Sequence, residues 1–195
     1  MRLICIRHGQ TTGDVEDRYG GSYDDALSPE GESQVRAMVE ELADGGIEQI
    51  FSSPLKRALQ TAESLGARLG CAITRHDALR ERDRYGALSG MTKAEAAAAY
   101  PDWVDRLADR FQSIPGSETY EAASQRIRAA CDHVLKQTRT CSAIVWHGGG
   151  MGILFHDLLK KEGIGTIGDC GWVELETTGA LDTLSIRRMK RIEGA

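Results

Sequence analysis

Two histidines of this 195-residue chain stand where an imidazole could take up a phosphoryl group. His8 directly follows Arg7, and His147 precedes three glycines at 148–150. A histidine attacks phosphorus only when its imidazole is neutral, and a cation beside it disfavours protonation. The forked guanidinium of arginine also fits the charged oxygens of a phosphoryl group. Arg7 and His8 therefore indicate phosphoryl transfer to histidine, with His147 as a second donor.

Two further residues would supply what such a site needs. Arg57 falls in the first turn of a helix that we expect to begin at Ser53-Pro54, where free backbone N–H groups and the helix dipole favour an anion. Glu81, in an arginine-rich loop, is a candidate to protonate the leaving oxygen.

Each of these residues also has an ordinary interpretation. Taken alone, His8 is equally a turn residue, Arg57 an exposed helix charge and Glu81 a partner in a solvated ion pair. His147 is more specific, because its glycines let the backbone approach a ligand closely. The hypothesis therefore depends on whether the fold brings the residues together.

Strand and helix patterns alternate along the chain. Helix patterns with capping residues or closing glycines lie at 28–45, 53–70 and 118–137, and a further helix is expected after residue 150, to about 161. This alternation predicts an α/β fold, a three-layer sandwich whose mainly parallel central sheet is flanked by helices. Ligands bind at the carboxyl ends of strands in such sheets, where both histidines fall. Apolar runs predict the strands at 3–6, 47–51, 72–74, 141–146, 172–176 and 181–187.

Residues 79–116 differ in character from the rest of the chain and predict a small helical segment. Thr92 and Glu95 form a capping box before an alanine-rich helix that ends at Pro101, and a second short helix is expected near 102–111. No linker divides the chain, so we expect a single domain over residues 1–195. Five side chains of this segment either shape a substrate pocket or form a hydrophobic cluster of their own: Tyr85, Tyr100, Trp103, Phe111 and Ile114.

Composition argues against several classes of function. The chain has 24 basic and 29 acidic residues, a net charge of −5, which disfavours nucleic-acid binding. No apolar run approaches the roughly 20 residues needed to span a bilayer, so we expect no membrane partner. Five cysteines without paired spacing predict free thiols, and the short apolar start, charged again at Arg7, is typical of a first strand and not of a signal peptide. We therefore expect a cytoplasmic protein; the sequence does not indicate its oligomeric state.

Six stretches resemble the motifs of the histidine phosphatase superfamily, which includes the cofactor-dependent phosphoglycerate mutases. The resemblance implies that His8 is phosphorylated during turnover, and that Glu81 is the proton donor and then the base that activates water. Arg7, Arg57 and His147 would hold the phosphate, and the mechanism needs no metal ion or cofactor. The resemblance also implies that residues 79–116 form a small helical cap segment over the active site. The stretches occur in family order across nearly the whole chain: Ile6–Thr11, Asp25–Gly31, Ile50–Ala62, Leu79–Arg82, Pro115–Glu118 and Val145–Gly149.

The expected phosphate pocket departs from the family pattern in its polar lining. By the resemblance, Gly148 and residue 14 line the phosphate, but this chain has Asp14 where the family has asparagine. A carboxylate there repels a phosphate unless it is protonated, paired with an arginine or turned away. Asp169 likewise stands in place of a family asparagine.

Two further departures leave the shape of the pocket open. Trp146 is larger than the usual family residue, so it either packs in the core or narrows the pocket floor. The segment from Glu81 to Tyr85 is one residue longer than usual, so the resemblance does not assign the placement of Arg82 and Arg84.

The phosphatases of the family are favoured over the mutases. Mutases are generally longer and grip the substrate carboxylate with adjacent arginines, whereas Arg106 and Arg110 are four residues apart here. Mutases also tend to follow the second His-Gly with asparagine and arginine, whereas this chain continues with Gly149. Residues 85–95, by contrast, do resemble a mutase. We predict a phosphoric monoester hydrolase for a small-molecule phosphate ester; sugar phosphates, a nucleotide-loop phosphate of cobalamin synthesis and phosphoglycerates all stay open.

Two alternatives to a phosphatase stay open. A cofactor-dependent phosphoglycerate mutase would use 2,3-bisphosphoglycerate as its cofactor. A non-catalytic module would bind a phosphate ligand without turnover, because of Asp14, although the otherwise intact set of site residues argues against it.

Overall fold

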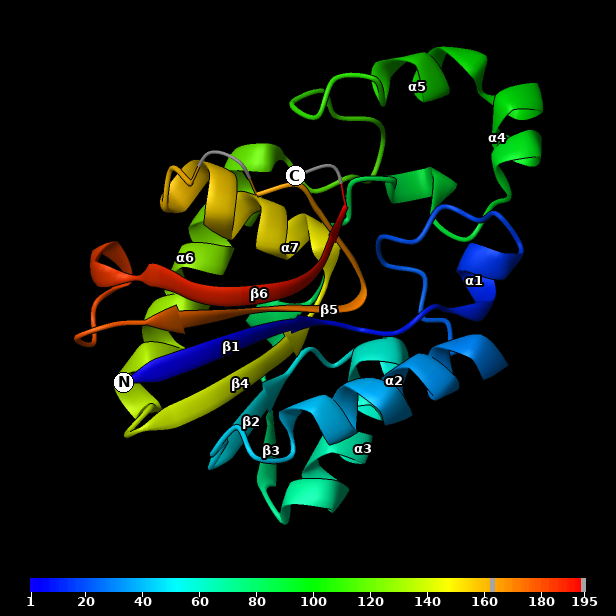
Figure 1. Ribbon diagram of the computed structural model, residues 1–195. Helices are drawn as coiled ribbons and strands as arrows, with labels where there is room; N and C mark the ends of the chain where they lie inside the picture. The colour runs from blue at the N-terminus through cyan, green and yellow to red at the C-terminus, as the bar shows by residue number, and fades with distance from the viewer. Residues whose placement is uncertain (162–163, 194–195) are drawn as a thin grey trace.

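Within residues 1–161 and 164–193, which the computed structural model describes, the chain forms a six-stranded sheet in the order β3-β2-β4-β1-β5-β6 (Figure 1). The first four strands along the chain are parallel, and β5 runs antiparallel to both of its neighbours. The predicted α/β fold with a mainly parallel sheet is confirmed. The strands are β1 (Arg2–Arg7), β2 (Gln49–Ser52), β3 (Ala72–Arg75), β4 (Cys141–Trp146), β5 (Thr166–Glu176) and β6 (Ser185–Glu193).

Helices cover both faces of the sheet and make it the middle of three layers (Figure 1). Side chains of β1 alternate between two hydrophobic cores, because successive strand residues point to opposite faces. The helices are α2 (Pro29–Leu42), α3 (Lys56–Leu69), α6 (Tyr120–Gln137) and α7 (Gly148–Gly152). Leu3 and Cys5 pack in the core with α6 and α7, and Ile4 and Ile6 pack in the core with α2 and α3.

A capping residue explains where α2 begins, but not where its neighbour α3 begins. Ser28 accepts the N–H of Gly31 at 3.0 Å and starts α2 as predicted. The Ser53-Pro54 pair does not start α3, which begins at Lys56 without a side-chain cap. Ser53 is therefore available to another part of the molecule.

The cap segment stands beside the sheet, near the ends where β1 and β4 stop (Figure 1). Thr92 and Glu95 form the predicted capping box. Leu88 and Ile114 belong to a hydrophobic cluster of the cap, against which Trp103 packs. The helical elements are η2 (Gly86–Leu88), α4 (Lys93–Ala99) and α5 (Pro101–Arg106), so the second cap helix is shorter than expected.

Three features differ from the prediction for physical reasons. α1 (Thr12–Val15) is a single capped turn, too short to carry a periodic pattern. β5 begins well before the expected start at Trp172. The sequence pattern does not reveal the earlier part of the strand, because a bulge after Ile167, with Cys170 at a φ of 54°, interrupts the alternation of side chains. The helix after β4 changes from α7 to a π-helical turn, η3 (Ile153–Leu158).

The register of β4 with its neighbours brings three chain segments to one edge of the sheet. Arg7 of β1 pairs with Trp146 of β4, and the N–H of His8 donates to the carbonyl of Trp146 at 3.2 Å. His8 and His147 therefore leave the sheet side by side. Ser53, just past β2, donates its N–H to a β4 carbonyl at 3.0 Å. Trp146 itself is 1% exposed and packs in the core, one of its two expected positions.

The remaining general expectations concern thiols and membranes. The five cysteines are free thiols, and four of them are buried. No helix in the described part of the chain is long and apolar enough to cross a bilayer.

Gly31 lets the loop after β1 lie directly on the first turn of α2. A Cβ at Gly31 would come within 1.9 Å of the backbone oxygen of Gln10. Because backbone must shift to relieve this overlap, we expect Gly31→Ala to lower the free energy of unfolding by about 1–3 kcal/mol, measured by urea titration. Gly152→Ala is the matched control: no described atom lies within 4 Å of its added Cβ, and alanine favours the helix. Equal stabilities of the two variants would contradict the close approach.

Candidate active site

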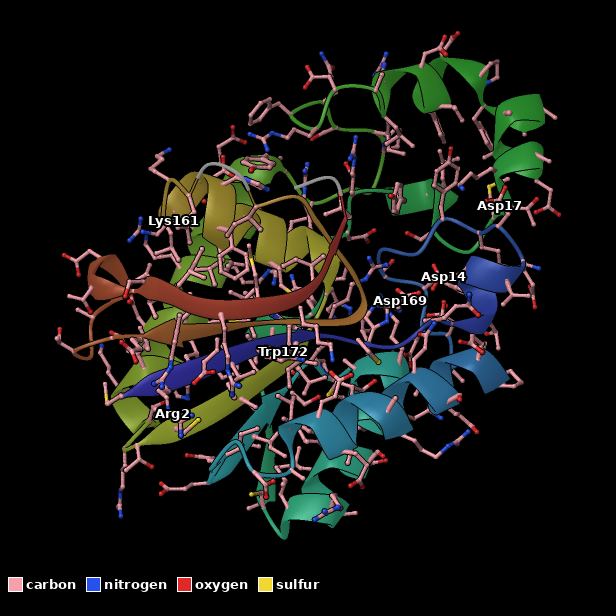
Figure 2. All side chains as sticks on the ribbon, in the orientation of Figure 1. Arg2, Asp14, Asp17, Lys161, Asp169 and Trp172 are labelled. Carbon is pink, nitrogen blue, oxygen red and sulfur yellow. The ribbon has the colours of Figure 1, made fainter. Side chains whose placement is uncertain are left out.

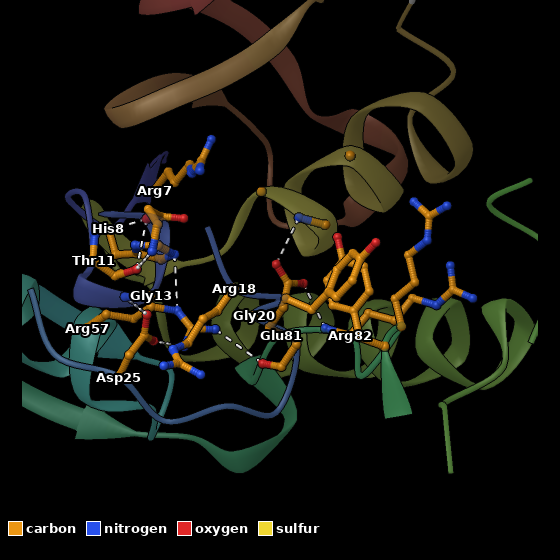
Figure 3. A pocket seen from close by; sticks show the side chains of 18 of the residues that line it. Arg7, His8, Thr11, Gly13, Arg18, Gly20, Asp25, Arg57, Glu81 and Arg82 are labelled. Atoms are coloured by element: carbon orange, nitrogen blue, oxygen red, sulfur yellow. Dashed lines mark hydrogen bonds and ion pairs between the residues drawn. The ribbon is translucent and has the colours of Figure 1, made fainter. Parts of the chain in front are cut away.

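A cavity of about 500 Å³ opens where β1 and β4 end, walled by the loop after β1, the cap segment and the start of α7 (Figure 3). His147 is fully buried behind the cavity wall and is absent from the residues that the structure places on its lining. The fold therefore brings the predicted residues together. Six of the seven line the cavity: Arg7, His8, Asp14, Arg57, Glu81 and Gly148.

His8 is held as a neutral imidazole with one nitrogen directed to Arg57. Its Nδ1 lies 2.7 Å from the carbonyl oxygen of Gly9, so Nδ1 carries the proton and donates it. Nε2 is left with a lone pair and accepts the Nε–H of Arg57 at 3.2 Å. Burial, together with Arg57 and Arg7, holds the pKa of His8 well below its ordinary value. The Nε2 lone pair is therefore available for attack at neutral pH.

Arg57 is a buried cation fixed by a buried carboxylate. Its Nη1 donates to Asp25 Oδ1 and to the carbonyl of Tyr23, both at 2.7 Å, and the Arg57 and Asp25 side chains are 4% and 3% exposed. Asp25 also accepts the N–H of Gly13 at 3.1 Å. Removing one partner of such a pair typically costs about 3–5 kcal/mol. In the sequence, Asp25 belongs to a motif stretch that does not assign it a role, because its place beside Arg57 depends on the tertiary fold.

His147 packs against His8 and is oriented by Ser53. The ring centroids of the two histidines are 5.2 Å apart, and His147 Nε2 lies 2.7 Å from Ser53 Oγ. Ser53 Oγ also accepts the N–H of Leu55 at 3.3 Å, which leaves its hydroxyl proton for Nε2. His147 Nδ1 then bears the proton and has no hydrogen-bond partner among the described residues. Burial, and then Arg57, hold the pKa of His147 well below its ordinary value.

Glu81 lies across the cavity from His8 and is held by two backbone N–H groups (Figure 3). Oε1 accepts the N–H of Arg82 at 2.7 Å, and Oε2 accepts that of Gly149 at 3.1 Å. A Cβ at Gly149 would come within 2.6 Å of Glu81 Oε1. Glycine after Gly148 therefore lets α7 approach the carboxylate.

Asp14 and Asp169 both lie near the end of β1 (Figure 2), and of the two only Asp14 is in the cavity lining. Asp169 pairs with Arg7, Oδ1 to Nη2, at 3.1 Å. Asp14 Oδ2 accepts the backbone N–H of Thr11 at 2.9 Å and its hydroxyl at 2.8 Å, in the capping box that starts α1. Of the three ways for Asp14 to coexist with a phosphate, the structure favours a carboxylate turned toward the helix start, but Asp14 still lines the cavity and keeps its negative charge there.

Aromatic side chains divide between the cavity and the cap. Tyr85 lines the cavity, and so does Tyr120 of α6, which the sequence did not single out. Tyr100 and Trp103 stack on each other with ring centroids 4.4 Å apart, and Ile114 is buried in the cap cluster. Of the five expected side chains, Tyr85 lines the cavity, Trp103 and Ile114 pack in the cap cluster, and Tyr100 and Phe111 are 40% and 54% exposed.

The two buried histidines should make stability depend on pH. Because the folded chain holds both neutral, the unfolded chain takes up more protons as the pH falls below about 6.5. Their contribution is complete above that pH and is lost below it, by up to about 1.4 kcal/mol per pH unit for each histidine. We expect urea unfolding of His147→Gln to lose less stability than wild type between about pH 7 and pH 5. Exposed His156→Gln should keep the wild-type slope; the same slope in all three proteins would contradict the burial argument.

Comparisons with known proteins identify the family of the chain. The family described as the histidine phosphatase superfamily (branch 1) matches residues 3–183. A solved mycobacterial glucosyl-3-phosphoglycerate phosphatase superposes with a TM-score of 0.81 at 28% identity, over 95% of this chain and 96% of that one. A Salmonella newport protein named "Probable phosphoglycerate mutase GpmB" is 32% identical over 162 residues, 82% of this chain and 75% of the relative.

One further relative is much longer than the region that it shares. A bifunctional protein of Mycobacterium tuberculosis is 38% identical over 136 residues, which are 69% of this chain but 37% of the relative. The chain thus spans little more than a third of that protein. The family match, in contrast, covers nearly the whole chain and includes the residues gathered at the cavity. The chain belongs to branch 1 of the histidine phosphatase superfamily.

Proposed function

We propose that this protein is a phosphatase that hydrolyses a small-molecule phosphomonoester through a phosphohistidine intermediate on His8. The observation that carries the proposal is the state of His8 at the cavity wall. Its Nδ1 proton is engaged by the Gly9 carbonyl at 2.7 Å, and its Nε2 lone pair lies beside Arg57 at 3.2 Å. A neutral nucleophile next to a fixed cation is what attack on a phosphate dianion requires.

The proposed reaction has two displacements at phosphorus. First, His8 Nε2 forms a bond to phosphorus while the ester oxygen leaves, and protonated Glu81 gives that oxygen its proton. Water then attacks the phosphohistidine, ionised Glu81 takes the water's proton, and the bond to Nε2 breaks to release phosphate. Arg7 and Arg57 stabilise the negative charge on the equatorial oxygens in both steps. Each step balances without a metal ion.

Phosphatase activity is favoured over mutase activity by two observations. The solved relative at 28% identity is a phosphatase by name, and its match covers almost the whole of both chains. Arg106 is exposed on α5, and Arg110 lines the cavity without an arginine next to it in the chain, so the adjacent arginine pair typical of the mutases is missing from this sequence. A phosphoglycerate mutase is the second candidate, because the relative at 32% identity carries that name. That activity would require 2,3-bisphosphoglycerate.

The first test is phosphate release by wild type and His8→Ala from an aryl phosphate and from 3-phosphoglycerate. We expect His8→Ala to lower kcat by about 10³-fold or more, because it removes the nucleophile. His156→Ala, an exposed histidine outside the cavity lining, is the matched control and should keep the wild-type rate. Phosphorus NMR of the same reactions, with and without 2,3-bisphosphoglycerate, separates the candidates. Isomerisation faster than release would make the protein a mutase, and turnover that survives His8→Ala would refute the mechanism.

Asp14 provides a second test of the phosphate pocket. Asparagine at this position can still accept the N–H of Thr11 while it removes a negative charge from the cavity. We expect Asp14→Asn to lower KM at neutral pH roughly fivefold, corresponding to about 1 kcal/mol of charge repulsion near a partly hydrated site. Initial rates over a range of phosphate-ester concentrations measure the change. An unchanged KM would show that the carboxylate does not act on the bound phosphate.

A further inference from the structure

Two side chains, those of Arg126 and Glu118, hold the loop that carries Glu81. Residues 81–84 lie outside the helices and strands that the structure describes, so their own backbone does not fix the direction of the Glu81 side chain. A general acid has to lie within hydrogen-bond distance of the oxygen that it protonates, and a small misplacement costs much of its effect. The contacts that hold this loop therefore bear directly on catalysis.

Arg126, on α6, makes four hydrogen bonds with one guanidinium. Its Nη1 donates to the carbonyl of Ala78 at 2.8 Å and to that of Arg80 at 3.0 Å. Its Nε and Nη2 donate to the two carboxylate oxygens of Glu118, at 2.8 and 2.6 Å. Since both carbonyls belong to the chain just before Glu81, the rigid fork of the guanidinium fixes the direction from which the chain enters that residue.

Glu118 holds the chain on the other side of Glu81 through its backbone. Its N–H donates to the carbonyl of Asp83 at 2.7 Å, and its carbonyl accepts the Nε–H of Arg82 at 3.3 Å. The hydrogen bonds therefore close a ring. It runs from Arg126 along the chain through Glu81 to the backbone of Glu118, whose carboxylate returns it to Arg126.

The ion pair in this ring is largely shielded from water. The Arg126 and Glu118 side chains are 12% and 13% exposed. Burial raises the pKa of Glu118, but the hydrogen bonds and charge of Arg126 outweigh burial and hold that pKa below its ordinary value. The carboxylate is therefore ionised at neutral pH, and its two bonds to the guanidinium are of the strong, charge-assisted kind.

Apolar packing alone does not explain how this loop is oriented. Leu79, just before the loop, is fully buried in the core that also contains Ile127 of α6. Such packing brings the loop onto the helix, but it is non-directional and does not aim a carboxylate. The hydrogen bonds of Arg126 supply the direction.

We infer that Arg126 and Glu118 are positioning residues for the proton donor, which aim the Glu81 carboxylate at the leaving oxygen. The inference rests on the proposed function, in which Glu81 is the acid. Arg126 lies outside the six motif stretches of the sequence, and Glu118 ends one of them without an assigned role. Losing the ring should slow proton transfer and leave the contacts of Arg57 with His8 in place.

The test compares two aryl phosphates whose leaving groups differ in their need for a proton. Phenolate is a strong base and leaves slowly unless it is protonated, whereas 2,4-dinitrophenolate is a weak base and leaves without a proton. For each ester, kcat/KM reports the formation of the phosphohistidine, the step in which Glu81 acts as acid. We expect Arg126→Gln to lower kcat/KM about tenfold or more for phenyl phosphate and less than about threefold for 2,4-dinitrophenyl phosphate. Equal losses for the two esters, or no loss, would overturn the inference, because damage to the phosphate pocket or to folding lowers both alike.

Two further variants separate the guanidinium fork from charge. Arg128→Gln removes an exposed arginine from the same helix and should keep the wild-type values for both esters. Arg126→Lys serves if Arg126→Gln does not fold, because it keeps a positive charge beside Glu118. One ammonium cannot reproduce the fork that reaches two carbonyls and a carboxylate, so we expect a selective loss of about threefold or more for phenyl phosphate. Wild-type values in Arg126→Lys would show that charge suffices without the fork and would overturn the inference.

Glu81→Gln keeps this inference separate from the proposed function. Since that variant lacks the proton donor, its loss for phenyl phosphate should exceed its loss for 2,4-dinitrophenyl phosphate by about 10²-fold or more. If Glu81→Gln discriminates between the esters and the Arg126 variants do not, the hydrolysis stands and the positioning role fails. If Glu81→Gln does not discriminate, or wild type hydrolyses neither ester, the proposed role of Glu81 fails.

Amide hydrogen exchange then decides the positioning role without turnover. The N–H of Arg82 donates to Glu81 Oε1 at 2.7 Å, so its exchange reports whether the carboxylate is held. We expect this amide to exchange about tenfold faster or more in Arg126→Gln than in Arg128→Gln. Equal exchange rates in the two variants would overturn the inference.

Discussion

The parallel pairing of β1 with β4 is the constraint on which the rest of the site depends. Arg7 lies opposite Trp146, so the two strands end side by side. The ring centroids of His8 and His147, which follow them, are therefore only 5.2 Å apart. Slipping a strand by one residue would turn each side chain to the other face. Trp146, buried in the core, opposes such a slip, because its ring would have to leave the hydrophobic layer. Core packing and site geometry are therefore set by the same register.

A second constraint is electrostatic. The site must bind an anion and also keep its histidine neutral, and one set of arginines serves both needs, because a cation lowers the pKa of His8 and attracts phosphate. Arg57 can remain buried because Asp25 neutralises it, at 2.7 Å, with the carboxylate placed on the side away from His8 Nε2.

Much of this architecture can be predicted from the sequence, because its signals are local. The apolar runs, the Ser28 cap and the Thr92 capping box belong to short windows, and the motifs around His8, Arg57 and Glu81 are contiguous. What the sequence could not provide depends on distant partners. The sequence predicts that a helix starts at Ser53, but the Ser53 hydroxyl is hydrogen-bonded to the ring of His147, 94 positions away. Neither α1 nor the bulge in β5 produces a periodic pattern, and the ion pair of Arg57 with Asp25 joins residues 32 positions apart in the chain.

The central claim is that His8 carries a covalent phosphoryl group during turnover. Rapid quenching of wild type with an excess of aryl phosphate, followed by peptide mass spectrometry under alkaline conditions, tests it directly, because phosphohistidine survives alkali and decays in acid. We predict one phosphoryl group on the peptide that contains His8, formed within a single turnover and lost when substrate is consumed. Turnover of the same ester with no phosphorylated peptide at any quench time, or with the group on another residue, would contradict this account.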